Sequence, residues 1–261
     1  MIAKHIEKDT KLFGLLADEA SSLKKARIVS EYFVELGIDA AYIPMNIRHD
    51  DIYFTIHGLK ESKIEAVNLG SEYTKSAFEQ MDIISDEASL CGFVDTIKIE
   101  NGKLLGSITI GEAFANILTQ INAKKITILG SGSLARSIIL HLKQTNVKEV
   151  VLLHERLESA MSLFESMQDQ LEGLEVDFDR YEKDIAYSAN TDALINTSSL
   201  GRVASDDFIK FSSYPTYLMD SVNPSRNSKS YFAAIASDKS RYLGGDDLSL
   251  EMIKIDSKNW F

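Results

Sequence analysis

Short apolar runs alternate with amphipathic segments along most of the chain. In its first part, apolar runs predict strands at residues 12–16, 40–47 and 64–69, and a hairpin with strands at 93–99 and 104–108. Glu100, Asn101 and Gly102 supply the hairpin turn. Helical periodicity predicts helices at residues 23–36 and 51–59 and shorter helical segments near 75–81 and 86–91. This alternation is typical of an α/β domain.

The same alternation continues in the second part of the chain. A helix is predicted at residues 111–121, and strands follow at 126–129, 149–153, 192–196 and 217–220 with helical spacers between them. Residues 246–261 predict a closing helix with an acidic start and an aromatic end. We therefore expect two α/β domains: residues 1–110 together with about 246–261, and residues 111–245.

Residues 124–142 form a strand, a glycine turn and an amphipathic helix in succession. Gly130 lets the chain turn sharply, Gly132 lets the backbone approach an anion, and Ala135 is small enough for the helix to pack on its strand. The first amides of such a helix have no internal partner and its dipole attracts negative charge. The pattern predicts a phosphate site, with a βαβ unit that binds nothing as the alternative.

An acidic residue follows the next predicted strand. That strand ends at residue 153 and leads into His154, Glu155 and Arg156. Glu155 therefore stands about twenty residues beyond the glycine turn, where dinucleotide sites hold the adenosine ribose. The two features together predict an NAD- or NADP-binding domain.

Composition limits the choice of partners. The 261 residues carry a formal net charge of −11, which argues against nucleic acid or an anionic membrane as the partner. No apolar run is long enough to cross a membrane and no signal peptide is evident, so a cytoplasmic protein is expected. Cys91 is the single cysteine, and the histidines lack metal-ligand spacing, so no disulfide or metal site is expected.

Several motifs recur in a recognisable order: FGLLAD at 13–18, GFVDT at 92–96, GKLLGSITIG at 102–111, GSGSLA at 130–135 and INTSSLG at 195–201. Ser22 with Leu23, Asn68, Asp220 with Pro224, and Gly244 with Gly245 extend the series. In this order the motifs resemble the shikimate dehydrogenase family. The resemblance implies an N-terminal substrate domain, a Rossmann-type dinucleotide-binding domain and a C-terminal helix that returns to the first domain.

The glycine turn and the resemblance together assign NAD or NADP to one group of residues. They are Gly130, Ser131, Gly132, Ser133, Leu134, Ala135, Glu155, Arg156, Asn196, Thr197, Ser198, Ser221 and Gly244. Glu155 falls where the family has an arginine for the 2′-phosphate of NADP, and a carboxylate would instead accept hydrogen bonds from a free ribose diol. This favours NAD, although Arg156 could reverse the preference by turning inward.

The resemblance also implies a substrate pocket, and there the chain departs from the family. The positions are Ser22, Lys24, Asn68, Thr74, Asp95, Ile110, Asn223 and Glu251. Thr74 and Ile110 occupy the places of the catalytic lysine and aspartate. Threonine cannot accept a proton near neutral pH and isoleucine has none to exchange, so shikimate oxidation at a useful rate is not expected.

Three lysines remain as candidates for chemistry in this pocket. Lys75 is adjacent to the lost lysine position, but it would need a local shift to replace it, and a solvated surface lysine is the alternative. Lys24 and Lys25 could hold a carboxylate or phosphate of a small anionic ligand. Their alternative is the first turn of an exposed helix.

Two functional hypotheses follow from these observations. The first is an NAD(P)-dependent oxidoreductase with a changed substrate. The second is a non-catalytic binding or regulatory protein that keeps the two-domain organisation. Either would be a monomer or a homodimer.

Overall fold

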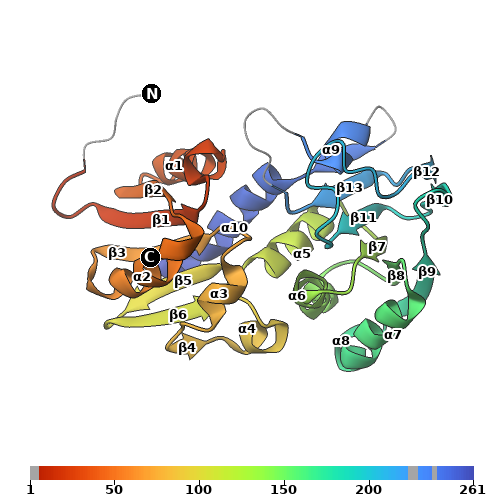
Figure 1. The fold of residues 1–261 in the computed structure, drawn as a ribbon, viewed down its shortest axis with the longest axis horizontal. Coiled ribbons are helices and arrows are strands. Elements are labelled where there is room, and N and C mark those ends of the chain that lie inside the picture. Colours follow the sequence, from red (N-terminus) through yellow and green to blue (C-terminus); the bar gives the residue numbers. More distant parts are fainter. Residues whose placement is uncertain (1–5, 223–228, 237–239) are drawn as a thin grey trace. The chain divides into compact units, whose positions relative to one another are not determined.

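The computed structural model describes residues 6–222, 229–236 and 240–261. The chain divides into two compact units, whose elements are labelled in Figure 1. Unit 1 comprises Met1–Thr109 and Met252–Phe261, and unit 2 comprises Ile110–Glu251. Both units are of the α/β class, as the hydrophobic pattern predicts.

A mixed six-stranded sheet forms the centre of unit 1, with the order β2-β1-β3-β5-β6-β4. Its strands are β1 (Lys11–Ala17), β2 (Ala40–Asn46), β3 (Ile64–Leu69), β4 (Ile83–Ile84), β5 (Thr96–Glu100) and β6 (Lys103–Ser107). β1 pairs in parallel with β2 and β3, whereas β5 is antiparallel to both β3 and β6. The predicted hairpin is thus β5 and β6, and its turn has positive φ at Asn101 (52°) and Gly102 (72°).

Short helices accompany this sheet. They are α1 (Lys25–Glu35), α2 (Ile52–Gly58), α3 (Thr74–Phe78) and α4 (Asp86–Cys91), with 3₁₀ turns at Ala20–Ser22, His49–Asp51 and Leu59–Glu61. α1 begins two residues later than predicted, because Leu23 is extended (φ −80°, ψ 141°) after the first 3₁₀ turn. That turn directs Lys25 into the interior, where it is buried.

The C-terminal helix α10 (Gly245–Trp260) ends within unit 1, as predicted. Ile253 and Trp260 belong to the same hydrophobic core as Phe13, Val29 and Phe33. The rings of Phe13 and Trp260 stack with centroids 4.7 Å apart and planes 11° from parallel. Burial of these large side chains fixes the end of α10 on the first strand.

Unit 2 contains a six-stranded sheet with the order β14-β13-β11-β7-β8-β9. Its strands are β7 (Lys125–Leu129), β8 (Glu149–His154), β9 (Glu175–Arg180), β11 (Ala193–Asn196), β13 (Tyr217–Asp220) and β14 (Arg241–Leu243). Every pairing in the sheet is parallel, and a separate parallel pair joins β10 (Tyr187–Ser188) to β12 (Phe211–Ser213). Strand order reverses at β7, which is the arrangement of doubly wound dinucleotide-binding sheets.

The helices of unit 2 connect these strands. They are α5 (Ile110–Gln120), α6 (Ser133–His141), α7 (Leu157–Ser166), α8 (Gln168–Leu171), α9 (Tyr231–Ile235) and the start of α10, with a 3₁₀ turn at Leu142–Gln144. The predicted helical spacer between β11 and β13 is wrong. Residues 197–216 contain β12 and otherwise irregular backbone, because Phe208 and Ile209 pack individually into the core beside Leu194 and Leu218.

The hydrophobic pattern missed β9 and β14. Glu175, Asp177 and Asp179 alternate along the exposed side of β9, which is an edge strand and keeps little apolar surface. β14 contains three residues, too few for a periodic signal. No helix in the described ranges has the length and apolar character needed to cross a membrane.

Candidate functional site

The turn after β7 requires glycine at its first position. Gly130 has φ of 107°, and a Cβ there would lie 2.7 Å from Thr197 Oγ1. Both the backbone conformation and the close approach of the 197–198 segment exclude a side chain. The sequence interpretation of Gly130 as the sharp turn is consistent with this geometry.

Gly132 has a different surrounding. It is the N-cap residue of α6, where no side chain caps the helix. A Cβ built on Gly132 meets no heavy atom within 4 Å, so the space in front of the first turn of α6 is open. Behind it, Ala135 is fully buried, which lets the helix approach the sheet closely. An open glycine before an uncapped helix start is a suitable cradle for a phosphate group.

The segment after β11 lies beside this turn. Asn196 pairs with Leu129 in the parallel register, and Thr197 donates to the Leu129 carbonyl from both its amide and its hydroxyl at 2.9 Å. The Asn196 side chain accepts from Ser198 N at 3.0 Å and Ser198 Oγ at 2.7 Å, and it donates to the Leu200 carbonyl at 2.8 Å. Asn196 is buried and shapes the turn, so Thr197 and Ser198 are the members placed next to Gly130.

Glu155 and Arg156 follow β8, the neighbour of β7 on the other side. Leu153 pairs with Leu129, so Glu155 leaves the sheet at the same carboxyl edge as Gly130. Glu155 is exposed, and Arg156 is the N-cap residue of α7, with its amide donating to His154 Nδ1 at 3.0 Å. The acid therefore has the strand position that the dinucleotide interpretation requires.

Ser221 and Gly244 follow β13 and β14 at this edge. A Cβ on Gly244 would lie 2.2 Å from the Tyr242 hydroxyl, so only glycine fits there. The Tyr242 hydroxyl donates to Asp220 Oδ1 at 2.7 Å, and Val222 N donates to the same oxygen at 3.1 Å. Asp220 Oδ2 is buried and has no hydrogen-bond partner within the described part of the chain. Burial raises the pKa of the Asp220 carboxyl.

The predicted cofactor residues are far apart in the sequence, but they follow strands of one parallel sheet and lie along its carboxyl edge. Open space at Gly132, the uncapped start of α6 and the acid after β8 suit the diphosphate and ribose of a dinucleotide. Among the residues that the structure describes, no cluster of His, Cys, Asp or Glu could hold a metal ion.

Unit 1 contains a second polar group, which was not expected from the sequence. We call it the Lys25 cluster. Its members are Lys25, Tyr42, Asn68, Asp95, Thr96, Thr109 and Asp256, all of them buried. They come from α1, β2, β3, the segment before β5, β5, the end of unit 1 and α10, so the cluster connects most elements of this unit.

The hydrogen bonds of the cluster are directed inward. The Asp256 carboxylate accepts from Asn68 Nδ2 and from Thr109 Oγ1, both at 2.8 Å. Asp95 Oδ1 accepts from the Thr109 amide at 2.9 Å, and Asn68 Oδ1 accepts from the Tyr42 hydroxyl at 2.8 Å. Asn68 and Asp95, which the resemblance assigns to the substrate pocket, are thus hydrogen-bonded to other members of the cluster.

Lys25 brings a positive charge into this group. It is 4% exposed, and its ammonium donates to Met252 Sδ at 3.9 Å. Burial lowers the pKa of Lys25, while the carboxylates of Asp256 and Asp95 oppose that change. Burial likewise raises the pKa of Asp256. The alternative that Lys25 lies in the first turn of an exposed helix is therefore wrong, because its side chain is buried near two carboxylates. Its role in holding an anionic ligand stays a prediction.

Sequence reasoning missed Asp256, although a signal existed. Ser249, Ile253, Asp256 and Trp260 recur at helical spacing and are all buried. An aspartate within a buried helical stripe needs a buried partner. Asn68 and Thr109 are its hydrogen-bond partners, and Lys25 supplies a nearby positive charge.

The remaining predicted substrate residues lie outside the Lys25 cluster, and two of them, Thr74 and Ser22, form hydrogen bonds to nearby backbone. Thr74 Oγ1 donates to the Ser71 carbonyl at 3.2 Å, and Lys75 is exposed on α3. Ser22 Oγ donates to the Glu19 carbonyl at 2.8 Å, and Lys24 is exposed before α1. Ile110 begins α5 and Glu251 is buried on α10, whereas Asn223 lies outside the described residues.

Glu72 and Asp95 are two acids of unit 1 that could act as a carboxylate pair only if they faced the same space. The Glu72 carboxylate accepts from the Asp18 amide at 2.8 Å and lies over Gly70, where a Cβ would meet it at 2.5 Å. Asp95 is engaged within the Lys25 cluster instead. The two acids have separate partners.

Fold and site together define a two-unit α/β protein whose second unit is a Rossmann-type dinucleotide-binding domain. No model of a protein family matches the chain. It is 30% identical over 193 residues to the shikimate dehydrogenase (NADP(+)) of Clostridium beijerinckii. The aligned region covers 72% of this chain and 68% of the relative. The chain therefore belongs to the shikimate dehydrogenase family.

The chain is also similar to other proteins. The shikimate dehydrogenase (NADP(+)) of Methanobrevibacter smithii is 28% identical over 198 residues, covering 75% of this chain and 70% of the relative. Among solved structures, ligand-free 5-ketofructose reductase of a Gluconobacter species superimposes with a TM-score of 0.74 over 98% of this chain and 94% of that one, at 20% identity. The latter likeness concerns the fold alone.

Proposed function

We propose that this chain is an NAD(P)-dependent oxidoreductase that acts on a small substrate other than shikimate. The observation that supports it most is the contrast between an open phosphate cradle at Gly132 and the changed residues at the family's proton-transfer positions, Thr74 and Ile110. Unit 2 would bind the cofactor and unit 1 the substrate.

Each part of the cofactor site has a defined task. The amides at the start of α6 would hold the diphosphate, and Glu155 would accept hydrogen bonds from the ribose. By family resemblance, Thr197 and Ser198 would lie against the nicotinamide. The nicotinamide, when bound, supplies hydride transfer, and the protein contributes binding and orientation.

Proton handling is where this chain differs from its relatives. A positioned acid or base is worth roughly a hundred- to ten-thousand-fold in rate, and neither Thr74 nor Ile110 provides one. In addition, Asn68, Asp95 and Thr109 are already hydrogen-bonded within the Lys25 cluster. A polyhydroxylated ring would have to displace those bonds. A related fold in 5-ketofructose reductase supports the idea that this architecture accepts other substrates.

We also propose NAD as the preferred cofactor, although the relatives named above carry NADP(+) in their names. The reason is the exposed Glu155 carboxylate at the end of β8, which would repel a 2′-phosphate. NADPH binding more tightly than NADH would overturn this preference.

The first test is binding, followed by turnover. Purified protein would be titrated with NADH and NADPH, using thermal unfolding as the readout, because a ligand specific for the folded state raises its stability. Oxidation of NADH would then be followed with a panel of small keto, hydroxy and amino carboxylates. Absence of dinucleotide binding at millimolar concentration would reject the proposal.

A second candidate is a non-catalytic dinucleotide-binding protein, favoured by the closed hydrogen bonding of the Lys25 cluster. Lys24→Ala and Lys75→Ala distinguish the two, since both side chains are exposed in unit 1. Turnover that disappears in either variant, with dinucleotide binding unchanged, would rule out the second candidate. Binding without turnover on the whole panel supports it.

A further inference from the structure

An apolar stripe follows one flank of α7 in unit 2. It consists of Leu157, Met161 and Phe164, which have the spacing i, i+4 and i+7 of a single helical face. Leu157 is 40% exposed and Met161 is 49% exposed, whereas Phe164 is half-buried. Scattered apolar side chains are ordinary on a protein surface, but adjacent ones on one helical face mark a candidate interaction site.

The stripe leads into a hollow of about 430 Å³ between α8 and the start of β9. Phe164, Leu171, Leu174 and Val176 supply its apolar walls. Phe164 also contacts β9, where its ring lies edge-on to the ring of Phe178 with centroids 5.5 Å apart. The stripe and the hollow are therefore continuous, and we call them together the α7 groove.

The strand beside the groove has two different faces. Val176 and Phe178 alternate along β9 with Glu175, Asp177 and Asp179. Successive side chains of a strand point to opposite faces of the sheet. Because Phe178 contacts α7, the apolar residues of β9 face the groove and the three acids face the other side of the sheet.

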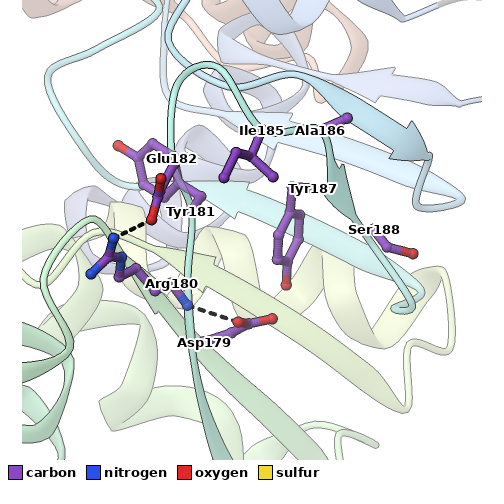
Figure 2. A pocket seen from close by; sticks show the side chains of 8 residues that line it. All are labelled: Asp179, Arg180, Tyr181, Glu182, Ile185, Ala186, Tyr187 and Ser188. Atoms are coloured by element: carbon purple, nitrogen blue, oxygen red, sulfur yellow. Dashed lines mark hydrogen bonds and ion pairs between the residues drawn. The ribbon is translucent and has the colours of Figure 1, made fainter.

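The free edge of β9 is closed to a further strand. The Glu175 amide donates to the carbonyl before β8 at 2.8 Å, so Phe178 and Arg180 direct their amides to the opposite, free edge. Both amides are already bonded, to Asp177 Oδ1 at 2.9 Å and to Asp179 Oδ1 at 2.8 Å. Figure 2 shows the second bond as the dashed line between Arg180 and Asp179. An occupant of the α7 groove is therefore not an added strand.

Acidic side chains form the rim of the groove. Glu158 and Glu165 are exposed on α7 next to the stripe, and Glu172 lies at the hollow. Residues 157–176 contain five acidic residues and neither lysine nor arginine. Apolar walls with an anionic rim select a partner that carries both apolar and cationic side chains.

The same charges disfavour two other occupants. The whole chain has a formal net charge of −11, so a second copy would bring like charges to the rim, and an anionic membrane would do the same. Arg136 of α6 does not offset the rim, because it donates to Ser166 Oγ, which is on the flank of α7 opposite Leu157.

We propose that the α7 groove is a docking site for a basic amphipathic helix of a partner protein. Apolar side chains of that helix at i, i+4 and i+7 would fill the stripe and the hollow, and its lysines or arginines would meet the acidic rim. The lengths agree, because Leu157 and Phe164 are two helical turns apart, about 10 Å, as are the first and last of three such anchors. This inference does not depend on the proposed dinucleotide site.

The experiment titrates the full chain with a fluorescent synthetic peptide of leucine and lysine, about four helical turns long, that has leucine at helical spacing. Fluorescence anisotropy measures its affinity, which should fall as salt is added. A second peptide has the same composition in strict leucine–lysine alternation, which is the pattern of a strand. It should bind at least about tenfold more weakly, because the edge of β9 is occupied.

Two variants locate the binding site. Met161→Lys places a cation at the centre of the stripe and should weaken the helical peptide at least about tenfold. Val203→Lys is the matched control, because Val203 is also 49% exposed, belongs to the same unit and lies outside the groove. It adds the same charge and should change the affinity less than about twofold. Neither variant should alter NADH binding.

Four results would overturn the inference. Absence of binding by the helical peptide would reject it directly. Equal losses in Met161→Lys and Val203→Lys would show that cations are attracted to the acidic chain without a defined site. Tighter binding of the alternating peptide would indicate strand addition, and a dimer that Met161→Lys dissociates in analytical ultracentrifugation would assign the groove to a second copy. Each result leaves the proposed function intact, since NADH binding is measured separately.

Discussion

The Lys25 cluster of unit 1 and the glycine turn of unit 2 are both polar, and they use their polar groups in opposite ways. In the cluster, Asn68, Thr109 and Asp256 are bonded to one another and buried. At the glycine turn, the start of α6 has no capping side chain and Gly132 faces open space. One region has satisfied its hydrogen bonds internally, and the other has donors available for a ligand.

Whether polar groups are already hydrogen-bonded within the fold distinguishes structural from binding roles better than residue type does. A buried charge needs partners within the fold, and once it has them it is costly to redirect. A binding site keeps its donors preorganised and exposed to the ligand. Asn68 resembles a family substrate residue in sequence, yet its surroundings here are those of a structural group. The two regions should therefore respond in opposite ways to substitution.

The largest effect is expected in the cluster. Asp256→Ala should lower the free energy of unfolding by about 3–5 kcal/mol, because it removes one of the two carboxylates that stabilise the charge of the buried Lys25. Urea denaturation measures it. Glu31→Ala is the matched control: Glu31 pairs with Arg27 at 3.8 Å on the surface of α1, and such pairs contribute about 0–1 kcal/mol.

A combined variant sharpens this test. Lys25→Met with Asp256→Leu removes both charges and keeps apolar volume, so it should recover part of the stability lost in Asp256→Ala. Equal costs for Asp256→Ala and Glu31→Ala would show that the cluster is not a buried ionic network.

A smaller effect, on binding rather than stability, is expected at the glycine turn. Gly132→Asp should weaken NADH binding by about tenfold or more, because a carboxylate would occupy the phosphate cradle. Its free energy of unfolding should stay the same or rise by a few tenths of a kcal/mol, since aspartate is a good N-cap residue. Fluorescence titration and urea denaturation measure the two quantities.

Gly132→Ala provides the size control for that experiment. Its Cβ would enter open space at an ordinary φ of −86°, so it should fold normally and reduce affinity less than Gly132→Asp. Unchanged NADH binding by Gly132→Asp would place the dinucleotide elsewhere.

Sequence reasoning succeeded where periodicity is strong and failed where partners are distant. β3 was predicted with its observed bounds, Ile64–Leu69, because apolar residues dominate this short segment and its last four residues are buried. The order of motifs identified the family, and family topology placed α10. The electrostatic interaction of Lys25 with Asp256 joins residues from opposite ends of the chain, and no local pattern reveals it.

The same limitation explains why β9, the strand beside β8, was not predicted. Glu155 was recognised by its distance from the glycine turn, a local rule. β9 pairs with β8 beyond it and has no such signal, because it is a charged edge strand without an apolar run.

The smallest expected effect concerns Asp220, whose role lies between the two regions: it is 1% exposed like the cluster, yet Oδ2 has no partner among the described residues. Burial raises the pKa of the Asp220 carboxyl above its ordinary value of 3.8. At pH values between 3.8 and the pKa of the folded state, the folded protein therefore retains a proton that the unfolded chain has lost. The stability from this proton is fully present below pH 3.8 and is lost as pH rises through the folded pKa.

Asp220→Asn avoids this loss. Its free energy of unfolding relative to wild type should increase with pH by at most about 1.4 kcal/mol per unit, then level off. The hydrogen bond from Tyr242 lowers the pKa, so the same comparison made in Tyr242→Phe should level off at a higher pH. Urea denaturation from weakly acidic to neutral pH measures both curves, and a difference independent of pH would show that Asp220 is ionised in the folded protein as it is in the unfolded chain.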